Sequence, residues 1–173
     1  MRRGEAEAFG GLFGAFREDV LRLCARLLGN ASDAEDAASE SFLRAHRAMD
    51  DYDDRRSFRS WLLSIAAHHC IDLLRRRSRE ARIFDPREMD TETLAAGGPS
   101  PLHGELDAER ARAVTGAIDA LPERYRAPLV LRFFAEQSYA EIAATLDLNE
   151  AQVGMLLHRA RRRLRELQEA HRP

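Results

Sequence analysis

Apolar residues along the chain recur every three or four positions, which is the spacing that buries one face of an α-helix. The first helix is expected to end at Gly29, since glycine is common just after a helix. A second is expected to open with a capping box of Ser32 and Glu35 and to run toward Met49. A third is expected over residues 58–79. No segment alternates with the period of a strand, so the pattern predicts an all-α protein.

The helical pattern breaks from residue 83 to 106, where Pro and Gly punctuate the chain and no apolar period survives. We expect this segment to be a flexible linker. A fourth helix is expected over residues 107–121. The next helix contains Pro128, which has no amide to donate, so it is expected to be kinked or to start late. The organisation is thus two small helical domains, residues 1–82 and 107–173.

A helix, a tight turn and a second helix are predicted over residues 138–165. Ser138 with Glu141 and Asn149 with Gln152 have the spacing of two capping boxes. The buried face of the second helix is expected to consist of Val153, Leu157, Ala160 and Leu164. Its far end is crowded with basic residues, which are Arg159, Arg161, Arg162, Arg163 and Arg165. Such a helix-turn-helix can place its second helix in a DNA major groove, while the plainer interpretation is a helical hairpin with a solvated basic end.

Composition and net charge exclude few classes of protein. The chain is 45% hydrophobic and 32% charged with a net charge of −2, and it contains no Lys. This charge argues neither for nor against nucleic acid, although the linker is acidic, with one Arg and five acidic residues. Cys24 and Cys70 lie in helical patterns, which favours reduced thiols. Without a signal peptide or an apolar run that could span a membrane, we expect a soluble cytoplasmic protein.

Enzymatic chemistry is not indicated. Adjacent residues on a helix point about 100° apart, so His68, His69 and Cys70 cannot converge on one metal ion. The sequence has no Gly-rich phosphate loop and no nucleophile elbow. We expect no catalytic residue, no metal and no cofactor. A metal-dependent enzyme that uses His68 and His69 remains an alternative that metal analysis would test.

Two charged surfaces of the first half are candidate binding sites for a partner. Asp33, Asp36 and Glu40 face away from the expected core of the second helix. They are either solvated acids that complement the helix dipole or a docking patch for a basic surface. Trp61 on the third helix is more typical of a core. The arginines at 75–77 are either a solvated face or a contact with single-stranded DNA.

Six short motifs together resemble the extracytoplasmic-function (ECF) group of the sigma-70 family. Each alone is weak, but their order, spacing and helical placement match. They are A-E-D-A-A-S-E-S-F at 34–42, R-S-F-R-S-W-L at 56–62, I-D-L-L-R-R at 71–76, L-P-E-R-Y-R at 121–126, Y-A-E-I-A at 139–143 and L-H-R-A-R at 157–161.

The resemblance implies that residues 1–82 bind the clamp of core RNA polymerase and the promoter −10 element. Residues 107–173 would bind the −35 element and the polymerase flap, and the linker would thread into the polymerase. An anti-sigma factor is a further expected partner. The expected polymerase-binding residues are Asp33, Asp36, Ser39, Glu40 and Arg44. The expected DNA-binding residues are Arg55, Arg56, Trp61, His68, Arg75, Arg76, Arg77, Ser138, Tyr139, Glu150, Gln152, Met155, Leu156, His158, Arg159 and Arg162.

The chain departs from the family pattern at three places. Ser39 stands where Gln is usual, Ala67-His68 replace Arg-Asn, and Gly154-Met155-Leu156 replace a segment that usually has Lys and Arg. We therefore expect −35 binding mainly through phosphates, with Met155 or Leu156 against thymine methyl groups. Alternatively, Leu156 packs on an anti-sigma factor.

The competing interpretation of the whole chain is a helix-turn-helix repressor or activator that binds duplex DNA without polymerase. Such a protein has no need of the acidic second helix or of a helix with aromatic and Arg residues in the first half.

Overall fold

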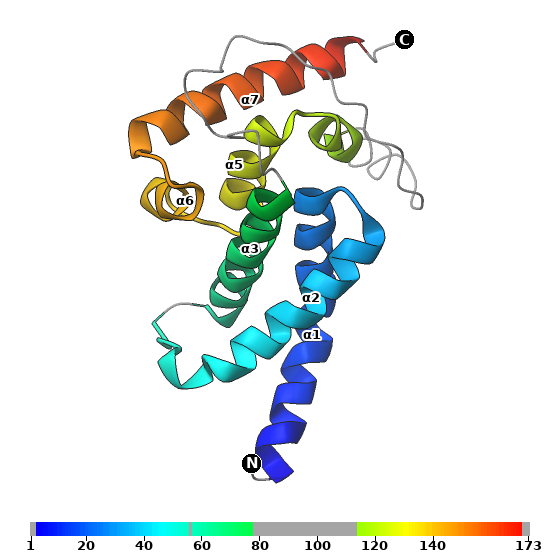
Figure 1. Ribbon diagram of the computed structural model, residues 1–173, viewed down its shortest axis with the longest axis vertical. Coiled ribbons are helices and arrows are strands. Elements are labelled where there is room, and N and C mark those ends of the chain that lie inside the picture. The colour runs from blue at the N-terminus through cyan, green and yellow to red at the C-terminus, as the bar shows by residue number, and fades with distance from the viewer. Residues whose placement is uncertain (1–2, 56, 78–113, 171–173) are drawn as a thin grey trace.

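The computed structural model describes residues 3–55, 57–77 and 114–170. The expected linker, the beginning of the expected fourth helix and Arg56 lie outside them. All regular secondary structure in the described residues is helical, which confirms the predicted all-α class (Figure 1). None of these helices is both long enough and apolar enough to cross a membrane.

The first half is a bundle of three helices (Figure 1). They are α1 (Arg3–Leu28), α2 (Ala31–Arg47) and α3 (Phe58–Arg77), and a short 3₁₀ turn (Met49–Asp51) follows α2. Each helix packs against the other two. The described part of the third helix ends at Arg77, and the last two residues of its predicted range lie outside the described residues. The second helix ends at Arg47 because the chain tightens into the 3₁₀ turn.

The corner between α1 and α2 is made by a glycine and an asparagine. Gly29 has φ of 68°, and its amide donates to the Ala25 carbonyl at 2.9 Å. This left-handed conformation is unstrained for glycine. The Asn30 side chain then accepts from the amides of Ser32 at 2.9 Å and Asp33 at 3.3 Å. Asn30 is thus the N-cap, and the prediction of Ser32 was wrong because the helix begins one residue before it.

Small side chains allow the three helices of the first half to pack closely. The buried apolar face of α2 is mostly alanine, with Phe42 as its large member. Cys24 of α1 and Cys70 of α3 are free, buried thiols. A hydrogen bond with Cys24, together with burial, raises the pKa of Cys70 far above its usual value. The Cys70 thiol therefore stays protonated and poorly nucleophilic in the native bundle.

The second half consists of shorter helices. Residues 114–119 are helical, and α5 (Glu123–Phe133), α6 (Tyr139–Leu146) and α7 (Glu150–Ala170) follow. The last helix packs on both α5 and α6.

Pro128 lies in the middle of α5 without ending it. The helix begins at Glu123, directly after Pro122 as N-cap, so the expected late start was wrong. Pro128 removes one amide donor from the helical ladder. Its own ring is buried with Ala127 and Leu129, and this burial offsets part of the lost bond.

The two halves are packed against one another. α5 contacts α1, and α6 contacts α3. In Figure 1, the yellow α5 lies beyond the upper ends of α1 and α3, and the orange α6 lies beside α3. Buried apolar residues of both halves form one continuous cluster. The sequence predicted the two helical regions but not this docking.

Candidate nucleic-acid interface

The helix-turn-helix is held by two reciprocal capping boxes, as predicted. The Ser138 hydroxyl accepts from the Glu141 amide at 3.2 Å, and the Glu141 carboxylate accepts from the Ser138 amide at 2.8 Å. Asn149 and Gln152 exchange equivalent bonds, both 2.9 Å long. Between the two boxes, Asp147 ends α6 in the left-handed conformation with φ of 57°. The angle between α6 and α7 is thus fixed by local bonds.

Capping restricts what two of the expected DNA contacts can do. The Gln152 side-chain oxygen accepts from the backbone that starts α7, and the Ser138 hydroxyl bonds Glu141. If either side chain turned to a base or phosphate, a helix end would lose a cap, which costs about 1 kcal/mol. Both are therefore positioning residues for the motif.

The buried face of α7 is wider than the sequence indicated. Val153, Leu157 and Ala160 are buried as predicted. Leu156 is buried as well, with only 4% of its surface exposed. The expectation that Leu156 faces solvent or DNA was therefore wrong: it stands three residues after Val153, and a helix that packs on two neighbours buries more than a narrow stripe.

The outer face of α7 is left with a short row of residues in its first three turns. Met155 is 38% exposed, and His158 and Arg162 are also exposed. Ala151 precedes them at the spacing of one helical turn, so the four residues share one face. Glu150 is exposed at the start of the helix. This face combines small, apolar and basic groups, which suits contact with thymine methyls and phosphates.

Gly154 lies where the ring of Tyr139 crosses α7. A Cβ atom at this position would be 3.7 Å from the Tyr139 ring, an ordinary van der Waals distance. The Arg132 guanidinium also lies over the Tyr139 ring, 5.8 Å from its centroid. Gly154 is thus a place of close approach but not one that only glycine could occupy.

Several arginines at the far end of α7 already have partners within the protein. Arg163 pairs with Glu166 at 3.1 Å, Arg162 pairs more loosely with Glu166 at 3.7 Å, and Arg161 stacks 5.6 Å from the Phe133 ring centroid. Arg159 is half-buried. Of the two expected DNA contacts at this end, the exposed Arg162, whose ion pair is loose, is better placed for a phosphate than the half-buried Arg159.

On α3, one expected DNA contact is half-buried in the bundle and two others are exposed. Trp61 is half-buried in an aromatic cluster, with ring centroids 5.0 Å from Tyr52 and 5.5 Å from Phe58. Arg75 and Arg76 are exposed at the other end of the helix. Trp61 therefore mainly supports the bundle, while the two arginines remain open to a phosphate.

Two further basic residues are paired locally. Arg77 makes an ion pair with Asp33 of α2 at 2.9 Å, which joins an expected DNA contact to an expected polymerase contact. Arg55 is exposed and pairs loosely with Asp53 at 3.8 Å.

The adjacent histidines of α3 point in different directions. His68 is exposed, and its Nδ1 lies 2.7 Å from the Ser64 carbonyl. His69 is buried, and desolvation lowers its pKa, so it is neutral at neutral pH. Among the residues that the structure describes, no three potential ligands gather around a metal position.

The outer face of α2 contains an apolar residue that sequence reasoning missed. Asp36 and Ser39 are exposed as expected, and Glu40 pairs with Arg44 at 3.1 Å. Leu43, one further turn along, is 53% exposed. The signal was available in the sequence, because position 43 follows position 36 by seven residues and shares its face.

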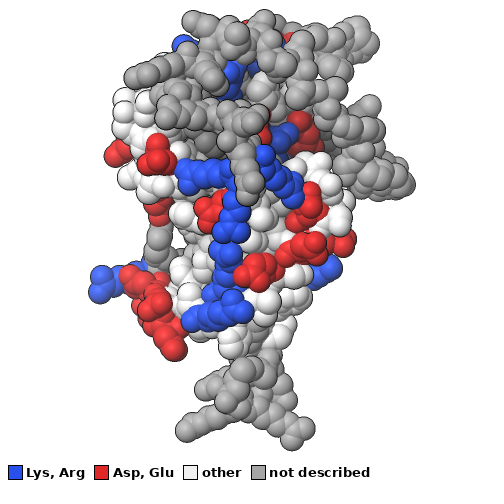
Figure 2. Space-filling view, viewed as in Figure 1, with Lys and Arg blue, Asp and Glu red and all other residues white. Residues whose placement is uncertain are grey.

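Charge on the surface is mixed in sign. Figure 2 shows that, on one face of the described residues, basic side chains form a narrow band with acidic side chains on both sides of it. On this face, attraction to DNA therefore depends on the arginines of the band and not on a broad positive area.

A helical bundle joined to a helix-turn-helix is an arrangement typical of DNA-binding proteins that have a second domain. A sigma-70 region 2 family model matches residues 12–80, and a sigma-70 region 4 model matches residues 111–164. The chain is 31% identical over 172 residues to the ECF RNA polymerase sigma factor SigW of Bacillus subtilis (strain 168), which covers 96% of this chain and 91% of that protein. It is 35% identical over 152 residues to the ECF sigma factor SigE of Mycolicibacterium smegmatis, which covers 88% of this chain but only 58% of that longer protein.

Solved structures share the fold. The sigma factor RpoE of Bartonella quintana, in complex with the anti-sigma factor NepR, superposes with a TM-score of 0.64 at 22% identity, covering 96% of this chain and 99% of that one. CnrH, in complex with the cytosolic domain of CnrY, gives 0.57 at 24% identity, covering 96% and 91%. The chain belongs to the ECF sigma factors of the sigma-70 family.

Proposed function

We propose that this protein binds core RNA polymerase in the cytoplasm and directs it to a small set of promoters, without catalysing a reaction itself. The observation that carries the proposal is the presence, in one chain, of a helix-turn-helix and of an α2 whose outer face combines Asp36, Ser39 and the exposed Leu43. A regulator that binds duplex DNA alone has no use for that second face. Family membership supports the same division of labour.

The proposed division of roles between the halves is the one that membership of the family implies. Residues 1–82 bind the polymerase clamp and the −10 element, with Arg75 and Arg76 near the melted strand. Residues 107–173 bind the −35 element through α7 and contact the polymerase flap. The region between them threads into the polymerase.

Run-off transcription with purified core polymerase tests the function directly. The template is DNA from upstream of the protein's own coding region, and a promoterless fragment of the same length is the control. We expect a discrete transcript only when protein, core polymerase and upstream DNA are all present. DNA binding without any polymerase-dependent transcript would favour the regulator instead.

Contact with the −35 element is expected to run mainly through phosphates, with Met155 against a thymine methyl. Met155→Arg on a randomised −35 library tests this placement, with the uncharged Met155→Leu as the matched control. An arginine in the groove gains preference for a guanine, worth about 1–3 kcal/mol. An unaltered sequence profile in the arginine variant would remove position 155 from the groove.

A negative regulator of the anti-sigma class is also proposed as a partner, since both solved relatives described above are complexes with such proteins or domains. The test is addition of an equimolar amount of the protein encoded beside this one to the run-off reaction. Loss of the transcript, reversed by excess sigma factor, is the expected result. Full transcription at equimolar and tenfold excess would exclude that protein as the regulator.

A further inference from the structure

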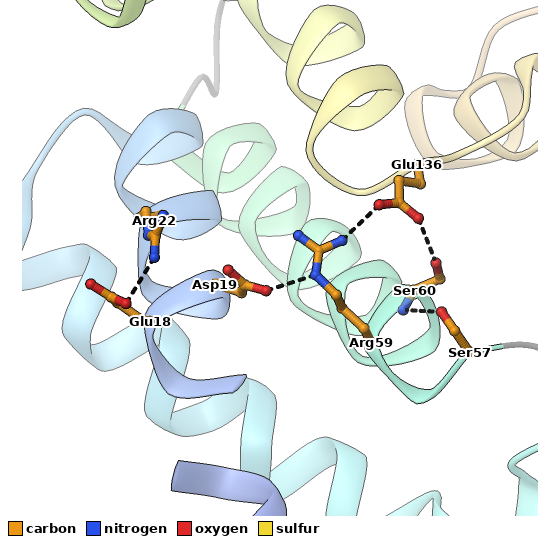
Figure 3. Close-up of polar contacts among 7 residues, drawn as sticks. All are labelled: Glu18, Asp19, Arg22, Ser57, Arg59, Ser60 and Glu136. Atoms are coloured by element: carbon orange, nitrogen blue, oxygen red, sulfur yellow. Dashed lines mark hydrogen bonds and ion pairs between the residues drawn. The ribbon is translucent and has the colours of Figure 1, made fainter. Parts of the chain in front are cut away.

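The carboxylate of Glu150, the first residue of α7, is exposed and has no partner within the described residues. Several other carboxylates of the protein are engaged. Glu18 pairs with Arg22 at 2.8 Å, and Glu136 accepts from Arg59 at 2.8 Å (Figure 3). Glu150 is therefore free to accept a hydrogen bond from a group outside the protein.

The next turn of α7 explains why Glu150 has no partner on its own helix. A glutamate usually pairs with a basic residue three or four positions later. Those positions are held here by the buried Val153 and by Gly154. A side chain at position 154 would also lie over the preceding turn, where Glu150 stands. The absence of a side chain at Gly154 thus leaves the carboxylate uncovered as well as unpaired.

The polar neighbours of Glu150 are committed to the protein. Asn149 Oδ1 accepts from the Gln152 amide, and Gln152 Oε1 accepts from the Asn149 amide, both at 2.9 Å. Ala151, the remaining residue of this turn, has no polar side chain. Glu150 therefore supplies the polar side chain of the first turn that can reach another molecule without opening a helix cap.

The position of Glu150 suits contact with a base. Side chains on a helix tilt toward its N-terminus, so the carboxylate of a first residue extends past the helix start. In a helix-turn-helix, the N-terminal residues of the second helix are the ones that contact base edges. Arg162 and Arg165 are exposed at the far part of α7. The groups that attract phosphate and the group that can face a base are thus separated along the helix.

The chemistry of a carboxylate selects among the four bases. A carboxylate only accepts hydrogen bonds, so it needs a donor. In the major groove, the donors are the N4 amino group of cytosine and the N6 amino group of adenine, and adenine presents its N7 acceptor beside N6. Guanine presents two acceptors, O6 and N7, and thymine presents the acceptor O4. A carboxylate therefore favours cytosine and most strongly disfavours guanine.

We propose that Glu150 is a specificity-determining residue of the −35 contact, and that it selects a cytosine and rejects a guanine on the strand that it faces. The inference rests on the proposed function, in which α7 binds the −35 element. Phosphate contacts such as that of Arg162 supply affinity for any sequence. Glu150 repels phosphates and lowers that affinity, but a wrong base also leaves its carboxylate without a donor. Its contribution is discrimination between sequences.

Exchange of the carboxylate for an amide tests the assignment. Glu150→Gln keeps the size of the side chain but adds a donor, which matches the N6 and N7 groups of adenine. Core polymerase with the unaltered or altered full chain selects from a library of the protein's upstream DNA, randomised over the −35 region. We expect a cytosine preference of about fivefold at one position, and a shift toward adenine at that position in the variant. An unaltered profile without such a position, or equal profiles for both proteins, would overturn the proposal.

A truncation distinguishes base selection from a structural role. Glu150→Ala should lose the cytosine preference and bind the pooled library about two- to threefold more tightly, because the repulsion from phosphates is removed. Asp147→Asn is the matched control: it removes an exposed carboxylate just before α7, and asparagine tolerates the left-handed conformation. Circular dichroism checks that each variant is folded. Uniformly weaker binding to all sequences in Glu150→Ala, or the same change of profile in Asp147→Asn, would contradict base selection by Glu150.

The selection separates the possible failures. If the unaltered protein with core polymerase enriches no −35 sequence, the proposed −35 binding is contradicted, and the role of Glu150 with it. If it enriches a −35 sequence that Glu150→Gln enriches equally, the role of Glu150 alone is contradicted.

Discussion

The outer face of α2 and the row of polar residues on α3 belong to the same bundle but differ in access. Asp36, Ser39 and Leu43 of α2 are exposed in the docked molecule. On α3, Ser60, Ser64 and His68 are bonded to the second half. The α2 face expected to meet polymerase is therefore exposed, whereas the α3 row is hydrogen-bonded to the second half. His68, the one expected DNA contact in that row, is nevertheless exposed.

The largest effect on polymerase binding is expected from reversing the charge on the outer face of α2. Asp36→Arg with Glu40→Arg should weaken binding to core polymerase about tenfold or more, because like charges then meet a basic partner surface. Stability should change little, since the pair of Glu40 with Arg44 is an exposed helical pair worth about 0.3–0.5 kcal/mol. Fluorescence anisotropy with labelled protein measures the affinity. Glu18→Arg, on exposed α1, is the control, and equal affinities for both variants would remove α2 from the polymerase interface.

A second effect, on promoter opening, is expected from the exposed arginines at the C-terminal end of α3. Arg75→Ala with Arg76→Ala should lower the yield of open complex and reduce the slope of log K against log salt by about one unit for each lost phosphate contact. Arg77→Ala is the matched control from the same turn, because Arg77 is already paired with Asp33. Permanganate footprints over a salt series provide the readout. Normal melting in the double variant would make this end of the helix a scaffold only.

A moderate effect is expected from the exposed apolar residue of α2. Leu43→Gln keeps the size and the helix propensity of the side chain but removes its apolar surface, so we expect about threefold weaker binding to core polymerase. Thermal unfolding should be unchanged, because Leu43 is outside the core. If core affinity is equal to that of the unaltered protein, Leu43 has no part in the interface.

The smallest effect is expected on stability, from a substitution in α7 of the second half. Gly154→Ala should stabilise α7 by up to about 1 kcal/mol, because alanine has the higher helix propensity and the new methyl group meets the Tyr139 ring at an ordinary distance. Chemical denaturation measures the change, with Gly116→Ala, where a Cβ meets nothing within 4 Å, as comparison. Destabilisation at position 154 would show that Tyr139 needs a closer approach than the structure indicates.

Local chemistry decided which parts of the molecule were predictable from sequence. The capping boxes of Ser138 with Glu141 and of Asn149 with Gln152 involve residues three apart, so their spacing alone identified both helix starts. Ser32 with Glu35 had the same spacing and was wrong, because the position of the cap depends on where the preceding helix ends. Asn30, directly after Gly29, was the better signal.

Tertiary packing decided the rest. Leu156 fits either face of α7 by periodicity, and only the neighbouring helices make it a buried residue. Nothing in the spacing of Ser60, Ser64 and His68 indicated a partner, since the residues that meet them lie more than 70 positions later in the chain. For the same reason, the docking of the two predicted domains could not be predicted from the spacing of residues along the chain.

At the end of α1, two residues that contact each other are synthesised at widely separated times. Arg126 Nη2 donates to the Leu27 carbonyl at 3.5 Å, across 99 positions of sequence, and Nη1 donates to the Asp119 carbonyl at 3.1 Å. On the ribosome, α1 is therefore completed long before the guanidinium that binds its last turn has been synthesised. Its carbonyl must remain hydrated through that interval, and the first bundle must fold alone, as N-terminal domains generally do. Docking of the halves is then the last step of the protein's biosynthesis.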